Sequence, residues 1–265
     1  MKGPQEQYTN ELSRKFGYKA TWLPGMPLRL GDIGILNNYV YTPVTTLEFF
    51  QIPFEVREDD TKDDLEYSSN GQITITSKIS GTVSPAGSTF TNSDAGLIVE
   101  FSSQNSIFFK ANQAQVILIN NTNKIGEEII KLYEEGKWNK HWVVITQLVK
   151  AESATILLSN SSNAKIELKA NANINSSNLD IADAQFNFSS SFLKGLETKI
   201  IAQRGLTPLF KVKGLRNRIF LPPSFIDRGM RAFDLVTPET ARSKYKDEIY
   251  FDFINEDLRF KPENV

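Results

Sequence analysis

The sequence predicts an α+β protein: a central, twisted, mainly antiparallel sheet with long amphipathic hairpins and a few peripheral helices. Several segments alternate apolar and polar residues, which is typical of strands that bury one face. Two other segments repeat apolar residues every three or four positions, which is typical of helices lying on a sheet. The 265 residues, 40% of them apolar, are enough for a sizeable core.

Composition excludes several classes of protein. The chain has no cysteine and one histidine, His141, which excludes disulfides, thiol nucleophiles and sites that need two histidines. The 30 basic and 31 acidic residues argue against a general nucleic-acid-binding surface. No apolar run approaches the ~18–20 residues of a membrane-spanning helix, and the polar residues 1–10 do not form a secretory signal. We expect no catalytic residues, no metal and no cofactor.

Residues 5–16 predict the first helix. Tyr8, Leu12 and Phe16 are four residues apart and therefore share one helical face. Gly17 follows directly and provides the left-handed residue that commonly ends a helix. We expect this helix to lie at the periphery of the sheet.

Two stretches precede the first long strands. Residues 28–35 predict a short extended element, and residues 47–54 form an apolar run that Pro53 interrupts. Residues 55–66 carry seven acidic and two basic side chains, which is typical of an exposed loop. A cation site is the alternative for this segment, although it lacks the aspartate spacing of a calcium loop.

Residues 73–109 predict a first hairpin region. A turn-rich stretch over residues 84–94 separates its two alternating runs, and the second run is expected to continue to Phe109. Residues 116–119 then predict a further, buried strand. The apolar positions of the two alternating runs are Ile73, Ile75, Ile79, Leu97, Val99 and Phe101.

A second helix is expected over residues 125–135. Asn123 is a candidate N-cap for it, and Gly136 a candidate stop. Residues 141–149 then predict a strand with a large apolar content.

The second hairpin region shows the most regular alternation in the chain. Apolar and polar residues alternate over residues 164–175, and the pattern resumes over residues 182–189 after a turn at residues 176–178. Its apolar positions are Ala164, Ile166, Leu168, Ala170, Ala182, Ala184, Phe186 and Phe188.

The remainder of the chain divides into a basic and an acidic part. All charged residues over 199–218 are basic, whereas the stretch from residue 234 onward carries eight acidic and five basic residues. Two prolines at residues 222 and 223 break any strand, so we place a boundary near residues 221–224. The predicted units are an α+β domain over residues 1–221 and an acidic tail over residues 222–265.

The alternating segments have two interpretations. Strands with one apolar and one polar face ordinarily cover a core. Three features instead favour insertion into a membrane: a length near the ~9–11 residues of a membrane-spanning strand, small apolar residues, and a polar face rich in serine and asparagine. Unpaired backbone groups are costly in a bilayer, so the few strands of each protomer must close an oligomeric β-barrel.

Short motifs resemble those of the bacterial gasdermins, the prokaryotic relatives of the pore-forming domain of animal gasdermins. The similarity covers roughly residues 12–212. The motifs are Leu12-x4-Gly17-Tyr18, Leu23-Pro24, Pro27-Leu28, Ala95–Phe109 with Val116–Ile119 and a short helix, Trp142–Thr146, and Leu206–Phe210. This chain differs from the family in lacking an N-terminal cysteine, often palmitoylated there, and in the greater length of its C-terminal tail.

The resemblance implies a membrane pore-forming effector that is autoinhibited in the cytoplasm. Proteolysis near the C-terminus, or another trigger, would release it to assemble into a large homo-oligomeric pore in the inner membrane and cause cell death in anti-phage defence. Its partners would be membrane lipids, copies of itself and an activating protease. The fourteen apolar positions of the two hairpin regions would face lipid.

Basic side chains would contact the anionic headgroups, since each contributes ~1 kcal/mol close to such a surface. The acidic tail would mask them until it is cut. These residues are Arg14, Lys15, Lys199, Arg204, Lys211, Lys213, Arg216 and Arg218.

Two other function classes remain open from the sequence. A β-rich adaptor without membrane activity would use exposed strand edges to pair with a partner. An enzyme is the third possibility, although His141, Asp32 and Asp94 lie where structural histidines and turn-forming acids usually lie. No nucleotide-binding loop, metal cluster or nucleophile elbow is present in the sequence.

Overall fold

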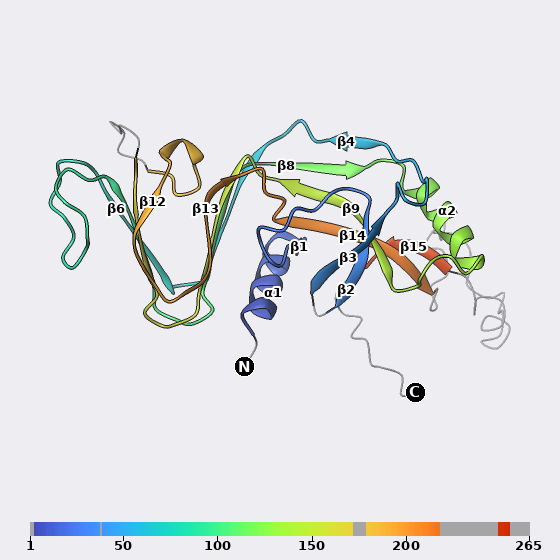
Figure 1. Ribbon diagram of the computed structural model, residues 1–265, viewed down its shortest axis with the longest axis horizontal. Helices are drawn as coiled ribbons and strands as arrows, with labels where there is room; N and C mark the ends of the chain where they lie inside the picture. Colours follow the sequence, from blue (N-terminus) through green and yellow to red (C-terminus); the bar gives the residue numbers. More distant parts are fainter. Residues whose placement is uncertain (1–2, 38, 172–178, 218–248, 255–265) are drawn as a thin grey trace, which may run out of the picture.

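A computed structural model of the chain describes residues 3–37, 39–171, 179–217 and 249–254. Within these residues the protein consists mostly of antiparallel sheet with two α-helices, so the predicted α+β class is confirmed (Figure 1). A large sheet runs through the molecule, and a smaller sheet packs against one end of it. The helices lie at the periphery, as the sequence predicted.

The large sheet has one continuous path and several short strands attached to it. The path is β1 (Lys19–Ala20), β14 (Leu209–Asn217), β9 (Trp142–Lys150), β8 (Ile107–Ile119), β10 (Ser153–Ser159) and β13 (Leu196–Arg204). The attached strands are β2 (Asp32–Asn37), β3 (Val40–Thr46), β4 (Val56–Glu58), β5 (Asp63–Ser68) and β15 (Ile249–Phe253).

The smaller sheet has four antiparallel strands. Their order is β12 (Ser189–Lys194), β11 (Lys165–Lys169), β7 (Gly96–Phe101) and β6 (Ile73–Lys78). The two predicted hairpin regions therefore lie beside each other, with β7 next to β11. We call this assembly the four-stranded sheet.

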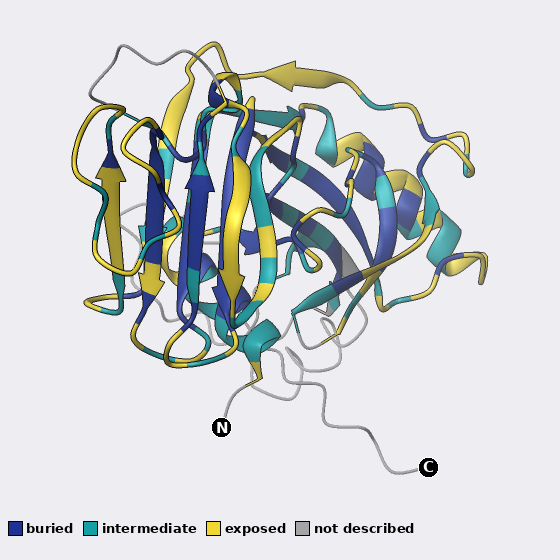
Figure 2. Cartoon of the chain, turned by 60° about the vertical axis from the view of Figure 1, so that its left-hand side comes forward, coloured by how far each residue is buried: buried dark blue, intermediate teal, exposed yellow. Residues whose placement is uncertain are grey.

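Three layers meet at this end of the molecule. Phe108 and Leu157 of the large sheet point towards the four-stranded sheet and share its apolar cluster. Their neighbours Phe109 and Ile156 point the opposite way and pack with Leu12 of α1 (Pro4–Phe16). The alternation along each strand thus serves two cores, one on each face of the large sheet. Figure 2 shows buried positions running along the strands of both sheets.

The other end of the large sheet is covered by α2 (Thr122–Glu134). Its residues Ile125 and Ile129 are buried with Ile33, Val144 and other side chains of the sheet. Strand β15 pairs with β14 on this side, so residues of the predicted tail form part of the large sheet.

Both predicted helices are confirmed, with small differences at their ends. α1 ends where Gly17 adopts a left-handed conformation with φ 71°. α2 begins three residues earlier than expected, because Asn121 and not Asn123 precedes its first turn. Gly136 has φ 72° just after α2, as expected for a stop residue.

Two predictions in the first half of the chain were wrong. Residues 107–119 form one strand, β8, instead of two, and β8 belongs to a different sheet from β7. The acidic segment over residues 55–66 is not a simple loop, because β4 and β5 both pair with β8. Their side chains are mostly exposed, so charge placed at this sheet edge is compatible with pairing.

The strands of the second hairpin region are shorter than the alternation over residues 164–175 and 182–189 predicted. β11 ends at Lys169, and residues 172–178 lie outside the described part of the chain. Residues 184–186 form a 3₁₀ turn instead of a strand, and β12 begins only at Ser189. The carboxylates of Asp180 and Asp183 accept the backbone N–H groups of residues two positions later, and such local bonds compete with a strand ladder.

Candidate functional site

The inner face of the four-stranded sheet carries an uninterrupted apolar row. Ile75, Val99, Ile166 and Leu193 are opposite one another across the four strands. Val99 and Ile166, on the central strands, are 0% exposed. Ile75 and Leu193, on the edge strands, are 42% and 48% exposed. The two central residues of the row are therefore buried in the core, and the two residues on the edge strands are partly accessible to solvent.

Most of the predicted lipid-facing residues lie on or next to this inner face. Val99 and Ile166 of the apolar row share one cluster with Ile73, Leu97, Phe101, Ala164 and Leu168. Ile79 and Ala170 lie just beyond the ends of β6 and β11.

Residues 182–188 lie off the sheet, in the connection between β11 and β12. Phe188 packs against the edge of the same cluster. Ala184 and Phe186 belong to the 3₁₀ turn, and Ala182, just before it, is buried.

The outer face of the same sheet carries a group of charged side chains beside Ile98 and Phe192. Glu100, Lys165 and Glu167 form a chain of ion pairs, with Lys165 Nζ 3.5 Å from Glu100 and 3.0 Å from Glu167. Glu100 is 52% exposed at its side chain, whereas Glu167 is 1% exposed. The alternation over residues 164–175 places Glu167 on the polar face of its strand, yet its side chain is buried because the connection between β6 and β7 covers it.

The buried carboxylate of Glu167 is held in its charged form. Thr89 donates two hydrogen bonds to Glu167 Oε2, from its backbone N–H at 2.7 Å and its hydroxyl at 2.6 Å. Burial by itself raises the pKa of Glu167, but the bonds from Thr89 and the Lys165 ammonium outweigh burial and hold the pKa below its usual range.

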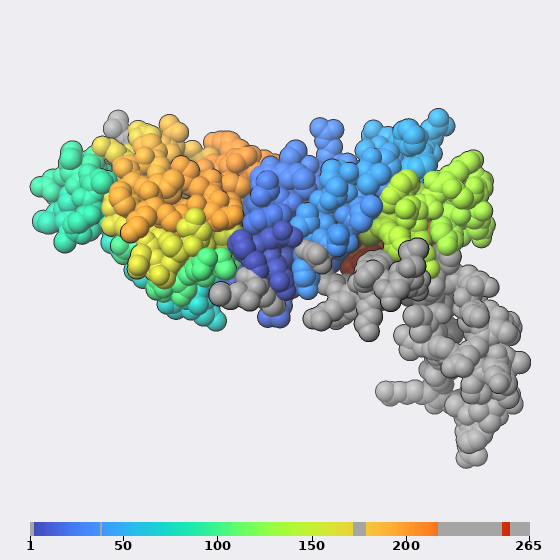
Figure 3. Space-filling view, turned by 60° about the horizontal axis from the view of Figure 1, so that its bottom comes forward, coloured from blue at the N-terminus to red at the C-terminus, as the bar shows by residue number. Residues whose placement is uncertain are grey.

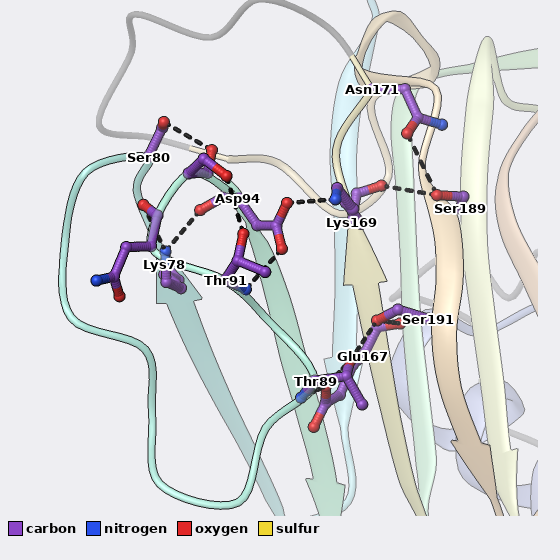
Figure 4. Close-up of polar contacts among 12 residues, drawn as sticks. Lys78, Ser80, Thr89, Thr91, Asp94, Glu167, Lys169, Asn171, Ser189 and Ser191 are labelled. Carbon is purple, nitrogen blue, oxygen red and sulfur yellow. Dashed lines mark hydrogen bonds and ion pairs between the residues drawn. The ribbon is translucent and has the colours of Figure 1, made fainter.

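A second carboxylate anchors the same connection (Figure 4). Asp94 pairs with Lys169 of β11 and accepts the backbone N–H of Thr91 at 2.6 Å. The hydrogen bond from Lys169, with that from Thr91, lowers the pKa of Asp94 to about 2. Lys78, only 2% exposed, donates to the backbone carbonyl of Asp94 at 2.7 Å.

The connection between β11 and β12 is also held by side chains. Asp180 lies 2.9 Å from Lys110 Nζ of β8, and Thr155 of β10 donates to the carbonyl of Ile181 at 2.7 Å. Burial raises the pKa of Asp180, yet the Ala182 N–H and Lys110 outweigh it and leave the pKa below its ordinary value. Both connections are thus fixed by a buried or half-buried acid.

The predicted headgroup-binding residues are divided between several elements. Arg14 and Lys15 are exposed at the end of α1, and Lys199 and Arg204 are exposed on β13. The other three described ones are half-buried on β14, and Arg218 lies outside the described residues. β13 and β14 follow each other along the chain, and β13 pairs with β10 whereas β14 pairs with β9.

The β14 lysines contact aromatic rings. Lys211 Nζ lies 4.3 Å from the ring centre of Tyr18, and Lys213 Nζ lies 4.8 Å from that of Phe253 in β15. Lys213 also donates to the hydroxyl of Thr122 at 3.2 Å. The tail strand β15 therefore covers one of the basic residues that the sequence singled out.

The acids proposed for the enzyme alternative have local structural roles. Asp32 accepts the backbone N–H of Arg29 at 2.8 Å, and Asp94 holds the turn described above. Across the described part of the chain, no three acidic or histidine side chains gather as a metal site would require. In the same residues, no helix combines the length and apolar character needed to span a membrane.

The sequence matches no protein-family model and no curated protein. The function is therefore argued from the geometry of the four-stranded sheet.

Proposed function

We propose that this protein forms membrane pores in the manner of the bacterial gasdermins, with the four-stranded sheet as the part that enters the bilayer. The observation that carries the proposal is the apolar row Ile75–Val99–Ile166–Leu193, which crosses all four strands on one face. The opposite face carries mainly charged and hydroxyl side chains, with Ile98 buried and Phe192 partly exposed among them. In a membrane β-barrel, the apolar face of the sheet contacts lipid and the polar face lines a water-filled lumen.

The edges of the sheet support assembly from several copies. Among the described strands, β6 pairs only with β7 and β12 only with β11, so each has one edge without a partner strand. β6 and β12 run antiparallel to each other, since every neighbouring pair in the sheet is antiparallel. A second copy placing its β6 beside β12 would continue the antiparallel order, and a closed ring of copies would leave no open edge.

The folded chain has to rearrange before its apolar face can meet lipid. That face is buried against Phe108 and Leu157 of the large sheet. Exposing a Leu, Val, Ile or Phe side chain costs ~1.5–3 kcal/mol each, and transfer into lipid would restore most of that amount. The barrier between the two states explains why a trigger is needed.

The strands must also lengthen. β6, β7 and β12 have six residues each and β11 has five, whereas a membrane-spanning strand has ~9–11. Seventeen residues join β6 to β7, and nineteen join β11 to β12. These connections contain enough residues to extend every strand, and Ile79 and Val83 would continue the apolar face of β6.

The trigger in this proposal is proteolysis within residues 221–244, followed by movement from the cytoplasm to the inner membrane. Cleavage there would separate β15 from β14 along the chain. Loss of β15 would expose the outer edge of β14 and the ammonium of Lys213, which Phe253 covers in the folded chain. The proposal includes cell death in anti-phage defence as the biological outcome.

The edge position of Ile75 allows a clean test of the lipid-facing surface. Ile166→Asp and Ala170→Asp would place a charge in the folded core and prevent folding, because both residues are buried. Ile75→Asp changes a residue that is already partly exposed. Thr76→Asp is the matched control, because Thr76 is the next residue on β6, exposed on the opposite face.

The two variants are compared as dye release from anionic liposomes after limited proteolysis. We expect Ile75→Asp to lose leakage, since a charged side chain on the lipid-facing side of a membrane strand is destabilising and the cost recurs in every subunit. We expect Thr76→Asp to leak like the unmodified protein. Equal leakage from both variants would contradict the assignment of this face.

The adaptor function uses the same open edges of β6 and β12. An extended segment of a partner could add to either edge as a further strand. This alternative predicts a stable complex and no liposome leakage from any fragment, so the same assay separates the two functions.

A further inference from the structure

The connection between β6 and β7 folds back over the outer face of the four-stranded sheet. It lies at one end of the molecule, shown in teal in Figures 1 and 3. Residues 81–88 extend away from the sheet, and Val83 among them is largely exposed. Residues 89–94 lie on the sheet, where Phe90 is buried against Gly96. We call residues 89–94 the strap.

The strap is fixed to three of the four strands by polar contacts. Thr89 bonds to Glu167 of β11, and its hydroxyl lies 2.9 Å from Ser191 Oγ of β12. Asp94 pairs with Lys169 of β11. Lys78, the last residue of β6, donates to the carbonyl of Asp94. Removal of the strap would take both Thr89 hydrogen bonds from the Glu167 carboxylate and leave it with the Lys165 ion pair among these contacts.

Several of the strap contacts involve charged groups. Hydrogen bonds to a charged group stabilise more than neutral ones, and a buried carboxylate without its donors is costly. The contacts also connect the strap to strands that are remote in the sequence, since 78 residues separate Thr89 from Glu167. Extending β7 back through residues 89–95 in its register with β11 must break the contacts of Thr89, because that register carries Thr89 away from Glu167 and Ser191.

We propose that the strap is a gate: it has to leave Glu167, Lys169 and Ser191 before β6 and β7 can lengthen, and until then it holds the four-stranded sheet in its short form. This inference rests on the proposed pore function. It adds a second lock, distinct from the tail, because β15 lies on β14 of the other sheet. Cleavage of the tail and opening of the strap are then two separate requirements for activity.

The absence of cysteine from the chain permits a reversible test. Thr89→Cys with Ser191→Cys places two thiols where hydroxyl oxygens lie 2.9 Å apart, close enough for a disulfide after a small adjustment. Oxidation would tie the strap to β12, and reduction would free it. The reduced protein serves as the folding control for the oxidised one.

A second cysteine pair is the matched control. Ser84→Cys with Asn92→Cys joins two positions within the connection, whose side-chain oxygens lie 3.4 Å apart, without tying it to the sheet. Continuing the β6–β7 register, in which Ile73 is opposite Phe101, would bring Ser84 within two residues of Asn92. This bond is therefore compatible with a longer hairpin.

The full-length proteins are incubated with anionic liposomes and cut by limited proteolysis, and dye release is recorded. We expect oxidised Thr89→Cys/Ser191→Cys to lose leakage and to regain it on reduction, whereas Ser84→Cys/Asn92→Cys should leak in both states. Glu167→Gln, which weakens the strap contacts, should leak roughly tenfold faster than the unmodified protein.

The possible failures are distinguishable. If the oxidised strap variant leaks as fast as its reduced form, the gate is wrong and the pore function stands. If Glu167→Gln leaks no faster than the unmodified protein, the hydrogen bonds between Thr89 and Glu167 do not control release of the strap. If the unmodified protein itself never leaks after cleavage, the pore function is wrong and the gate falls with it.

Discussion

Glu167→Gln is the substitution for which the structure gives the most specific energetic prediction. The carboxylate is 1% exposed at its side chain, accepts two hydrogen bonds from Thr89 and pairs with Lys165 at 3.0 Å. Glutamine keeps the shape and the acceptor oxygen but removes the charge. Hydrogen bonds to charged groups contribute ~1.5–3 kcal/mol and neutral ones ~0.5–1.5 kcal/mol, so two weakened bonds reduce the free energy of unfolding by roughly 2–3 kcal/mol.

Glu100→Gln is the matched control for this prediction. Glu100 contacts the same Lys165 ammonium, at 3.5 Å, but its side chain is 52% exposed. Exposed ion pairs contribute a median of ~0–1 kcal/mol, so the control should change the free energy of unfolding little. Comparison of the two variants separates the contribution of a buried, hydrogen-bonded carboxylate to the free energy of unfolding from that of an exposed charge.

The assay is equilibrium unfolding in urea at pH 7, followed by tryptophan fluorescence and analysed as a two-state transition. Because the pKa of Glu167 is lowered in the folded chain, its stabilisation is present above its unfolded pKa and is lost as the pH falls through the folded pKa. The difference between Glu167→Gln and the unmodified protein should therefore shrink in acid. If Glu167→Gln is no less stable than Glu100→Gln at pH 7, the hydrogen bonds from Thr89 to the buried Glu167 carboxylate do not stabilise the fold as expected.

Three further predictions concern the same sheet. Ile166→Ala should lower the free energy of unfolding by about 2–5 kcal/mol, measured by urea unfolding, since Ile166 is fully buried. Gly96→Ala should disturb both the β7–β11 pairing and the strap, seen as faster hydrogen exchange over residues 89–94, because a Cβ there would meet the backbone carbonyl of Leu168 and lie 2.6 Å from the Phe90 ring. Asp94, with a pKa of about 2, stabilises the strap above its unfolded pKa and stops doing so as the pH falls to about 2. Asp94→Asn should remove that part of the acid dependence, and an unchanged acid profile would show that the pair with Lys169 contributes nothing.

The apolar periodicities of the sequence predicted the helices and most central strands correctly. The four-residue spacing of Tyr8, Leu12 and Phe16 determined α1, because a peripheral helix needs one apolar face. The alternation at Ile73, Leu97 and Ile166 likewise identified β6, β7 and β11. The local pattern of apolar side chains is sufficient to predict a helix or strand that packs one face against a core.

Pairing between strands could not be predicted from the same patterns. β8 continues through Gln113, which has φ 50°, so a local irregularity and not an end of the strand lies between its two halves. The 3₁₀ turn over residues 184–186 also keeps an alternating sequence, yet the Asp183 carboxylate accepts the backbone N–H of Gln185, a local bond that competes with strand pairing. Tertiary context and local polar bonds decide such segments.

The polar part of the candidate site was missed for a related reason. Glu167 and Lys78 occupy positions that alternate correctly for an exposed face, and both are buried by a connection whose path the sequence does not define. The available signal was the combination of a serine- and threonine-rich turn with acidic and basic residues in strands of the same sheet. The contact between Thr89 and Glu167 depends on the path of the connection across the sheet, which no local pattern in the sequence indicates.

The most direct test of the central claim is dye release from anionic liposomes by the unmodified full-length chain, before and after limited proteolysis within residues 221–244. We expect no release from the intact chain and rapid release after cleavage, because the apolar face of the four-stranded sheet is buried until the tail is cut and the strap opens. No release from any fragment would contradict pore formation and favour the adaptor function. Release from the intact chain would contradict inhibition by the tail.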